Sequence, residues 1–147
     1  MRRLIPLMAI AVAIAALFAA GASGAGSTTV STRSKHELGR FLVNSKSVTL
    51  YLFEKDTKNK SNCFGACAQN WPPLMAHGKL VAKGGVKSSH LGTIKRGSGR
   101  QVTYFGHPLY TFVLDAKKPG STKGQDFLAF GAKWYVVGTN GRKIDHS

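Results

Sequence analysis

One short pattern occurs twice in this chain and constrains its fold more than any other feature of the sequence. Residues 51–56 and 110–115 both read Tyr-x-Phe-x-x-Asp, and each copy comes directly after a leucine. A tryptophan follows each copy further along the chain, at Trp71 and at Trp134. Because a duplicated unit usually folds as part of one body with internal symmetry, this repetition predicts two related repeats in one domain.

The segments around the two copies define the predicted organisation of the chain. The repeats span 38–77 and 92–144, joined by a Gly-, Lys- and Val-rich linker at 78–91 with at most one edge strand. Together they form a single domain over 38–145, because about 120 residues suffice for one core and not for two. A Ser-, Thr- and Gly-rich leader at 26–37 precedes the domain, and its composition predicts disorder.

Short apolar runs between Gly, Asn, Ser and Lys turns predict a mostly β fold. In the first repeat, 41–43 and 48–53 predict a hairpin whose second strand is apolar on both faces and therefore central. A short helical turn at 63–70, capped by Asn62, is expected to end at the prolines 72–73. The second repeat is predicted to hold a meander of strands at 93–95, 101–104 and 109–114, a strand at 134–137, and a type I′ hairpin at Asn140-Gly141. We expect these antiparallel strands to form one small sheet or sandwich-like domain with two pseudo-symmetric halves.

The first residues of the chain form a targeting segment. Arg2 and Arg3 supply a positive region, an apolar run follows at 4–20, and the small residues at 21–25 fit a cleavage site. This pattern predicts a signal peptide at 1–25, with a signal helix, and no transmembrane segment after cleavage. An uncleaved anchor is the alternative, although the run falls slightly short of the about 20 apolar residues that span a bilayer. No cysteine lies near the cleavage region, so we expect a secreted, periplasmic or cell-envelope protein without a lipid anchor.

Positive charge dominates the composition. The chain has 21 Lys and Arg against 6 Asp and Glu, and removing Arg2 and Arg3 leaves 19 against 6. Such a surplus favours anionic neighbours, among them teichoic acid, lipopolysaccharide and anionic lipid. The lysines are scattered and form no helical basic face, so the sequence predicts no specific recognition of nucleic acid.

The repeated motif admits a structural and a functional interpretation. In an extended strand the Tyr and Phe of each copy project from the same face, and the Asp stands at the strand exit. In the structural interpretation, the rings belong to the core and the aspartates close turns. In the functional interpretation, the rings line a groove between the repeats. Paired aspartates also suggest acid/base catalysis, but no nucleophile motif or histidine cluster accompanies them, so we predict no enzymatic activity. The candidate binding residues are Tyr51, Phe53, Asp56, Tyr110, Phe112, Asp115, Trp71 and Trp134.

Cys63 and Cys67 are the only cysteines, and in an exported protein an even pair predicts a disulfide. A four-residue spacing brings the two Cα atoms to about 6 Å in a helical turn, which a disulfide can bridge. A redox-active or metal-binding thiol pair is the alternative. Met75, His77 and His107 are the candidate copper or haem ligands under that alternative, and no cofactor is predicted otherwise.

Five segments of the chain, taken in order, resemble a known family. The resemblance is to the bacterial secreted-repeat family of predicted lipoproteins with a Tyr-x-aromatic-x-x-Asp motif. It covers 38–144 and implies an exported protein built from tandem repeats, with no biochemical activity to carry over. The segments that carry the resemblance are 49–56, 63–67, 71–74, 106–110 and 134–137.

Two features depart from that family. The chain lacks the lipidation cysteine of many relatives, which argues against a membrane anchor. Relatives have Asn-Gly before the His-Pro-Leu-Tyr segment, whereas this chain has Phe105-Gly106. Because Phe is unfavourable at positive φ, we predict a type II turn with Gly106 at its third position.

The sequence therefore predicts an exported, basic, non-enzymatic module that binds an envelope or extracellular ligand. Anionic envelope components are the expected partners. The alternative is a periplasmic accessory protein for redox reactions or for handling metal or haem, based on the two cysteines and the Met75/His77 neighbourhood.

Overall fold

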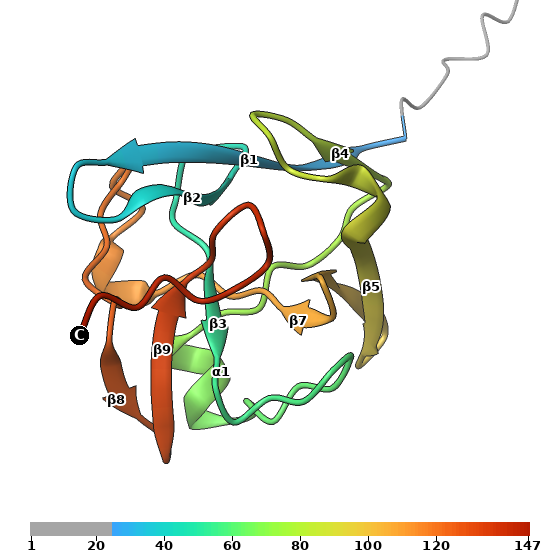
Figure 1. Cartoon of the computed structure of the whole chain (residues 1–147). Helices are drawn as coiled ribbons and strands as arrows, with labels where there is room; N and C mark the ends of the chain where they lie inside the picture. Colours follow the sequence, from blue (N-terminus) through green and yellow to red (C-terminus); the bar gives the residue numbers. More distant parts are fainter. Residues whose placement is uncertain (1–24) are drawn as a thin grey trace, which may run out of the picture.

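The computed structural model describes residues 25–147, and the predicted signal helix lies outside this part of the chain. The described residues fold mostly into β structure, as predicted, with one short α-helix (Figure 1). The elements are β1 (Ser27–Lys35), β2 (Gly39–Asn44), β3 (Tyr51–Phe53), α1 (Ala66–Asn70), β4 (Lys79–Ala82), η1 (Ser88–His90), β5 (Leu91–Arg96), β6 (Gly99–Tyr104), β7 (His107–Pro108), η2 (Val113–Asp115), β8 (Phe127–Ala129) and β9 (Ala132–Val136).

Three sheets of three strands each are present among the described residues, so the prediction of one small sheet was wrong. The strand orders are β2-β1-β4, β3-β9-β8 and β5-β6-β7. The second sheet joins the repeats, because β3 of the first repeat pairs with β9 of the second. The strands divide among several sheets because pairing crosses between the repeats and because β3 and β7 have only three and two residues.

The leader predicted to be disordered is instead the longest strand. β1 pairs antiparallel with β2 and parallel with β4, and it lies across the top of Figure 1. Its β-branched Thr28 and Val30 are buried on one face, and such residues suit a half-buried strand. Composition alone missed this two-residue alternation. The edge strand that the linker allowed is β4.

Three predicted local features of the chain differ in the structure. Only the first two strands of the predicted meander form a long hairpin, because the chain turns into η2 just after Phe112. The helical turn starts later than predicted, with Gly65 rather than Asn62 at its N-cap. Asn62 is not the cap because its N–H donates to Asp56 and its amide to the carbonyl of Lys55.

Two predicted turn types, at 105–106 and at 140–141, are also wrong. Phe105 and Gly106 have φ of 49° and 81°, a type I′ arrangement between the paired residues Tyr104 and His107. The Phe105 ring stacks on His90 at 3.7 Å, which offsets the unfavourable backbone conformation. In the hairpin at 140–141, only Gly141 has positive φ, so its turn is not type I′. A Cβ on Gly141 would clash with the Phe105 ring.

The core has two parts, one mainly aromatic and one mainly aliphatic, and β3 lies between them. Tyr51 and Phe53 point into the aromatic part, whereas Leu50 and Leu52 point into the aliphatic part. This explains why the strand is apolar on both faces, as predicted. The aromatic part contains the Tyr, Phe and Trp residues of both motif copies, and so contains the candidate site.

Candidate functional site

The two motif tyrosines lie directly opposite each other at the centre of the aromatic core. The N–H of Tyr51 donates to the carbonyl of Tyr110 at 2.8 Å, and the N–H of Tyr110 donates to the carbonyl of Tyr51 at 3.0 Å. Both residues have no exposed surface. This antiparallel bridge places equivalent residues of the two repeats in the same pairing position.

Each motif tyrosine donates a hydrogen bond to the aspartate of the other repeat. The Tyr51 hydroxyl donates to Asp115 Oδ2 at 2.7 Å, and the Tyr110 hydroxyl donates to Asp56 Oδ2 at 2.8 Å. The other oxygen of each carboxylate accepts a backbone N–H from the loop that follows it, Asn62 for Asp56 and Lys123 for Asp115. The aspartates therefore close their own turns and also fasten the partner repeat.

The phenylalanines and tryptophans also pair between the two repeats. Phe53 stacks on Trp134 at 4.1 Å, and Phe112 stacks on Trp71 at 3.9 Å, so each Phe meets the Trp of the other repeat. The two tryptophans stack on each other at 3.9 Å, with an angle of 5° between their planes. A continuous pile of four rings results, in the order Phe53, Trp134, Trp71, Phe112.

Burial determines what this arrangement can do. The six aromatic residues of the motif and its tryptophans are each at most 4% exposed, and Asp115 is 1% exposed. Asp56 is half-buried beneath Asn62 and Tyr110. In the structure the aromatic side chains of the motif therefore fill the core and form no open groove between the repeats.

The motif tyrosines are held in their neutral form. Burial raises the pKa of Tyr51 far above its ordinary value, and the hydrogen bond to Asp115 raises it further. Burial also raises the pKa of Tyr110, and the negative charge of Asp56 adds to this effect. For Asp56 itself, burial raises the pKa, while the hydrogen bonds from Asn62 and Tyr110 partly oppose the shift.

We expect Tyr51 and Tyr110 to ionise only when the protein unfolds. Because their folded-state pKa values exceed the unfolded value of about 10, their contribution to stability is complete below pH 10 and decreases above it. In an alkaline titration, part of the phenolate absorbance should therefore appear together with loss of the circular dichroism signal. The Tyr51→Phe/Tyr110→Phe variant should lose that part. Full ionisation of all tyrosines with the fold intact would contradict the assigned burial.

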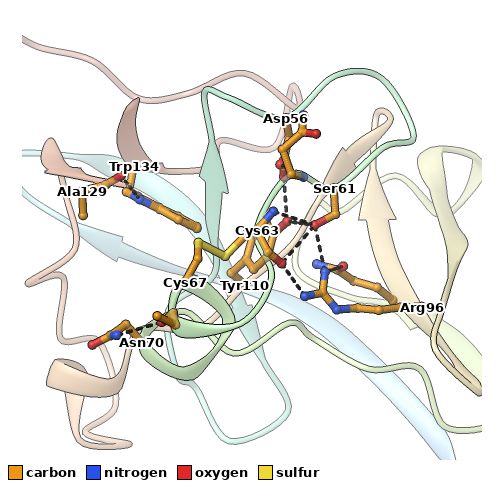
Figure 2. The surroundings of a disulfide bond; sticks show 12 residues. Asp56, Ser61, Cys63, Cys67, Asn70, Arg96, Tyr110, Ala129 and Trp134 are labelled. Atoms are coloured by element: carbon orange, nitrogen blue, oxygen red, sulfur yellow. Dashed lines mark hydrogen bonds between the residues drawn. A yellow bond between two sulfur atoms is a disulfide. The ribbon is translucent and has the colours of Figure 1, made fainter. Parts of the chain in front are cut away.

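The predicted disulfide is present between Cys63 and Cys67, whose Cα atoms are 5.2 Å apart (Figure 2). It ties the loop before α1 to the helix, and the N–H of Trp71 donates to the carbonyl of Cys67 at 2.8 Å. The bridge therefore helps to set the position where the chain enters the ring stack. No cysteine of the described chain is free.

An arginine network that the sequence did not reveal lies beside the disulfide (Figure 2). Arg96 donates to Ser61 Oγ at 2.8 Å, to Gln101 Oε1 at 2.9 Å, and to the carbonyl of Cys63. Ser61 Oγ also lies 2.7 Å from the Tyr110 hydroxyl oxygen. The network thus connects the surface to the Tyr110–Asp56 pair. Arg96 ends an ordinary hairpin strand, and nothing in its local sequence distinguishes it from the other cations.

The candidate metal ligands come from two segments of the chain, 75–77 and β7. Met75 pairs through its backbone with Gln101, His77 is exposed beside Thr28, and His107 lies in β7, where burial lowers its pKa. Within residues 25–147, no three His, Cys, Asp or Glu side chains are arranged to hold a metal ion.

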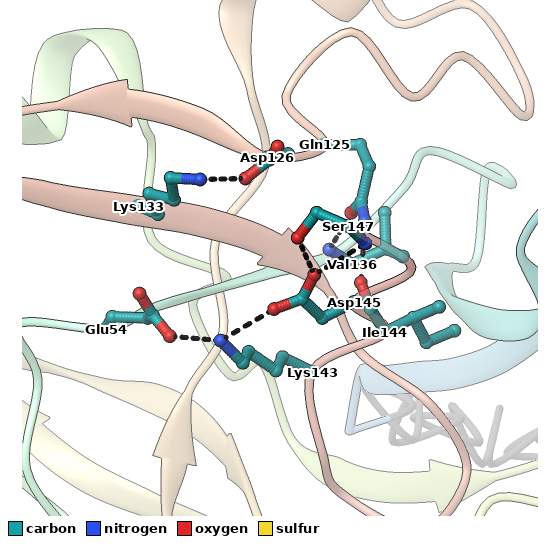
Figure 3. Close-up of polar contacts among 9 residues, drawn as sticks. All are labelled: Glu54, Gln125, Asp126, Lys133, Val136, Lys143, Ile144, Asp145 and Ser147. Carbon is teal, nitrogen blue, oxygen red and sulfur yellow. Dashed lines mark hydrogen bonds and ion pairs between the residues drawn. The ribbon is translucent and has the colours of Figure 1, made fainter.

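Most carboxylates of the described chain are already occupied. Lys143 pairs with Glu54 at 2.7 Å and with Asp145 at 3.0 Å, and Lys133 pairs with Asp126 at 2.7 Å (Figure 3). Two further carboxylates, of Asp56 and Asp115, accept hydrogen bonds from the motif tyrosines. The remaining Lys and Arg side chains of residues 25–147 form no ion pair, so the surface carries a large positive excess.

Fold and site together define a small disulfide-containing β protein in which two repeats share one core. The chain belongs to the family described as a secreted repeat of unknown function, whose family model matches residues 32–75 and 92–138. This confirms the family resemblance and the two repeats, which the sequence placed at 38–77 and 92–144. The same comparisons found no match among curated proteins or solved structures. No helix in residues 25–147 is both long and apolar enough to span a membrane.

Proposed function

We propose that this protein is an exported, non-enzymatic module that binds anionic polymers of the cell envelope through its basic surface. We also propose that its two repeats are pseudo-symmetric halves of one domain and that it is held by charge rather than by a lipid anchor. The observation that carries the proposal is the charge distribution. Of six carboxylates, three are in surface ion pairs and two are bound to the motif tyrosines, against 19 Lys and Arg outside the predicted signal peptide.

The condition of the motif aspartates supports a non-enzymatic role. A general acid or base must reach a substrate proton, but both carboxylates are already occupied by a tyrosine hydroxyl and a backbone N–H. Their hydrogen bonds hold the two repeats together. The redox or metal alternative has no supporting observation in the described chain, where both cysteines are in the disulfide and no three His, Cys, Asp or Glu side chains are arranged to hold a metal ion.

Retention on an anionic polysaccharide matrix should decrease steeply with salt. Screening by salt weakens contacts between exposed charges, so we expect binding at about 0.05 M salt and elution well below 1 M. A neutral dextran matrix is the control and should not retain the protein. Absent retention, or retention that salt does not change, would contradict the proposal.

A further inference from the structure

A basic groove of about 620 Å³ lies where the two repeats meet at the surface. One side is the loop 59–64 of the first repeat, which the disulfide ties down, and the other side is the β5–β6 hairpin of the second. Its lining includes Lys60, Lys95, Arg96 and Arg100, and none of the described residues that line it is a carboxylate. The groove therefore gathers four cations with no carboxylate in its lining.

The two arginines of this groove, Arg96 and Arg100, are held in place rather than free to move. Arg96 is fixed by three acceptors, and one of them, Gln101, is fully buried and bound in turn to the carbonyl of Leu109. The Arg100 guanidinium donates to Thr93 at 2.6 Å, across the hairpin. Because these side chains are already ordered, binding an anion costs less conformational entropy than binding to free surface lysines.

An exposed aromatic ring stands at the same groove. Phe64 follows Cys63 directly and is 62% exposed, more than the other exposed aromatic side chains of the described residues, Phe127 and Phe130. The Arg96 guanidinium lies over its ring at 4.7 Å from the centroid. The rest of the ring is open to solvent, and a ligand with an apolar face would pack against it.

We propose that the groove is the binding site for an anionic polysaccharide, a refinement that rests on the proposed function. Its acidic groups would meet Lys60, Lys95 and Arg100, and the apolar face of a sugar ring would stack on Phe64. The side-chain amide of Asn59 lines the same groove and can bond sugar hydroxyls. A bare phosphate polymer would use only the charges.

Two other clefts of the described surface fit such a ligand less well. The cleft beside β3 is lined by Glu54, Asp56 and Asp145 as well as by cations, so it would repel part of an anionic chain. The cleft over the loop 118–123 has three lysines but no aromatic ring. Only the groove with Phe64 offers both clustered cations and an open ring among these three.

A charge-matched pair of variants tests the position of the site. Lys60→Gln/Lys95→Gln and Lys79→Gln/Lys83→Gln each remove two exposed lysines that form no ion pair in residues 25–147. With a uronic-acid oligosaccharide as probe, the first should weaken binding about tenfold and the second much less. Equal weakening would overturn the groove and leave the proposed function intact. No salt-dependent binding by the unaltered protein would instead overturn the proposed function.

A second pair of variants tests the ring. Phe64→Ala should weaken binding of the uronic-acid oligosaccharide about fivefold, as expected for the loss of one aromatic contact. Leu128→Ala, which removes a side chain that is 70% exposed elsewhere, should leave binding unchanged. Poly(glycerol phosphate) of equal charge, which has no sugar rings in its backbone, should bind more weakly and should not respond to Phe64→Ala. Equal binding of both polymers, or no effect of Phe64→Ala, would overturn the proposal of a saccharide site.

Discussion

Replacing Trp71 with alanine is expected to lower the free energy of unfolding by about 3–5 kcal/mol. The indole has no exposed surface and stacks at 3.9 Å on both Phe112 and Trp134, so its removal leaves a cavity in the middle of the ring pile. A cavity there cannot close easily because Tyr51 also contacts the ring edge-on, at 5.4 Å. Urea denaturation followed by circular dichroism measures the loss.

Two comparisons make this prediction specific to the stack. Phe64→Ala removes an exposed aromatic ring and should cost less than about 0.5 kcal/mol. In a double-mutant cycle, Trp71→Ala and Trp134→Ala should be coupled by about 1 kcal/mol, because each removes the same indole–indole contact. Additive effects of the two substitutions would show that the tryptophans do not stabilise each other.

The sequence was sufficient to predict those features that depend on local pattern. The alternation of Leu50, Tyr51, Leu52 and Phe53 predicts a strand buried on both faces, and β3 separates two parts of the core accordingly. The spacing of Cys63 and Cys67 predicts their disulfide in the same way. In each case the relevant neighbours lie within a few residues along the chain, where backbone geometry alone limits the possibilities.

Features that depend on distant partners were not predictable. That Tyr51 bonds Asp115, and not the nearer Asp56, follows from the antiparallel pairing of the two repeats, which no local pattern encodes. The positive φ of Phe105 likewise depends on His90, whose ring supports it from a separate segment. Arg96 joins the candidate site only because β5 is brought against the disulfide loop.

The contacts between the repeats also separate the residues expected to stabilise the fold from those of the proposed binding site. Every aromatic side chain of the doubled motif is buried where the two repeats pack together, so the motif offers little exposed surface to a ligand. The loop just after the first copy is different, since it carries Ser61 into the network and Phe64 to the surface. We therefore expect substitutions in the motif to change stability and substitutions in the groove to change binding.

Asp115→Ala is expected to lower the free energy of unfolding by about 3 kcal/mol. The carboxylate accepts hydrogen bonds from the Tyr51 hydroxyl, the Ser121 hydroxyl and the N–H of Lys123, and its removal leaves these donors without an acceptor. Asp126→Ala is the matched control, because its carboxylate forms an exposed ion pair with Lys133 and should contribute far less to stability. Chemical denaturation of both variants measures the difference.

Measuring Asp115→Ala in the Tyr51→Phe protein separates the contribution of the Tyr51–Asp115 hydrogen bond from the contribution of the turn that Asp115 closes. In the Tyr51→Phe protein, Asp115→Ala should cost about 1–2 kcal/mol less than in the unaltered protein, because the Tyr51 hydroxyl is no longer present to be left unpaired. The single Asp115→Ala protein should still bind the uronic-acid oligosaccharide with unchanged affinity under conditions where it is folded. A loss of affinity without a loss of stability would mean that Asp115 belongs to a binding site, and the structural role assigned to the motif would be wrong.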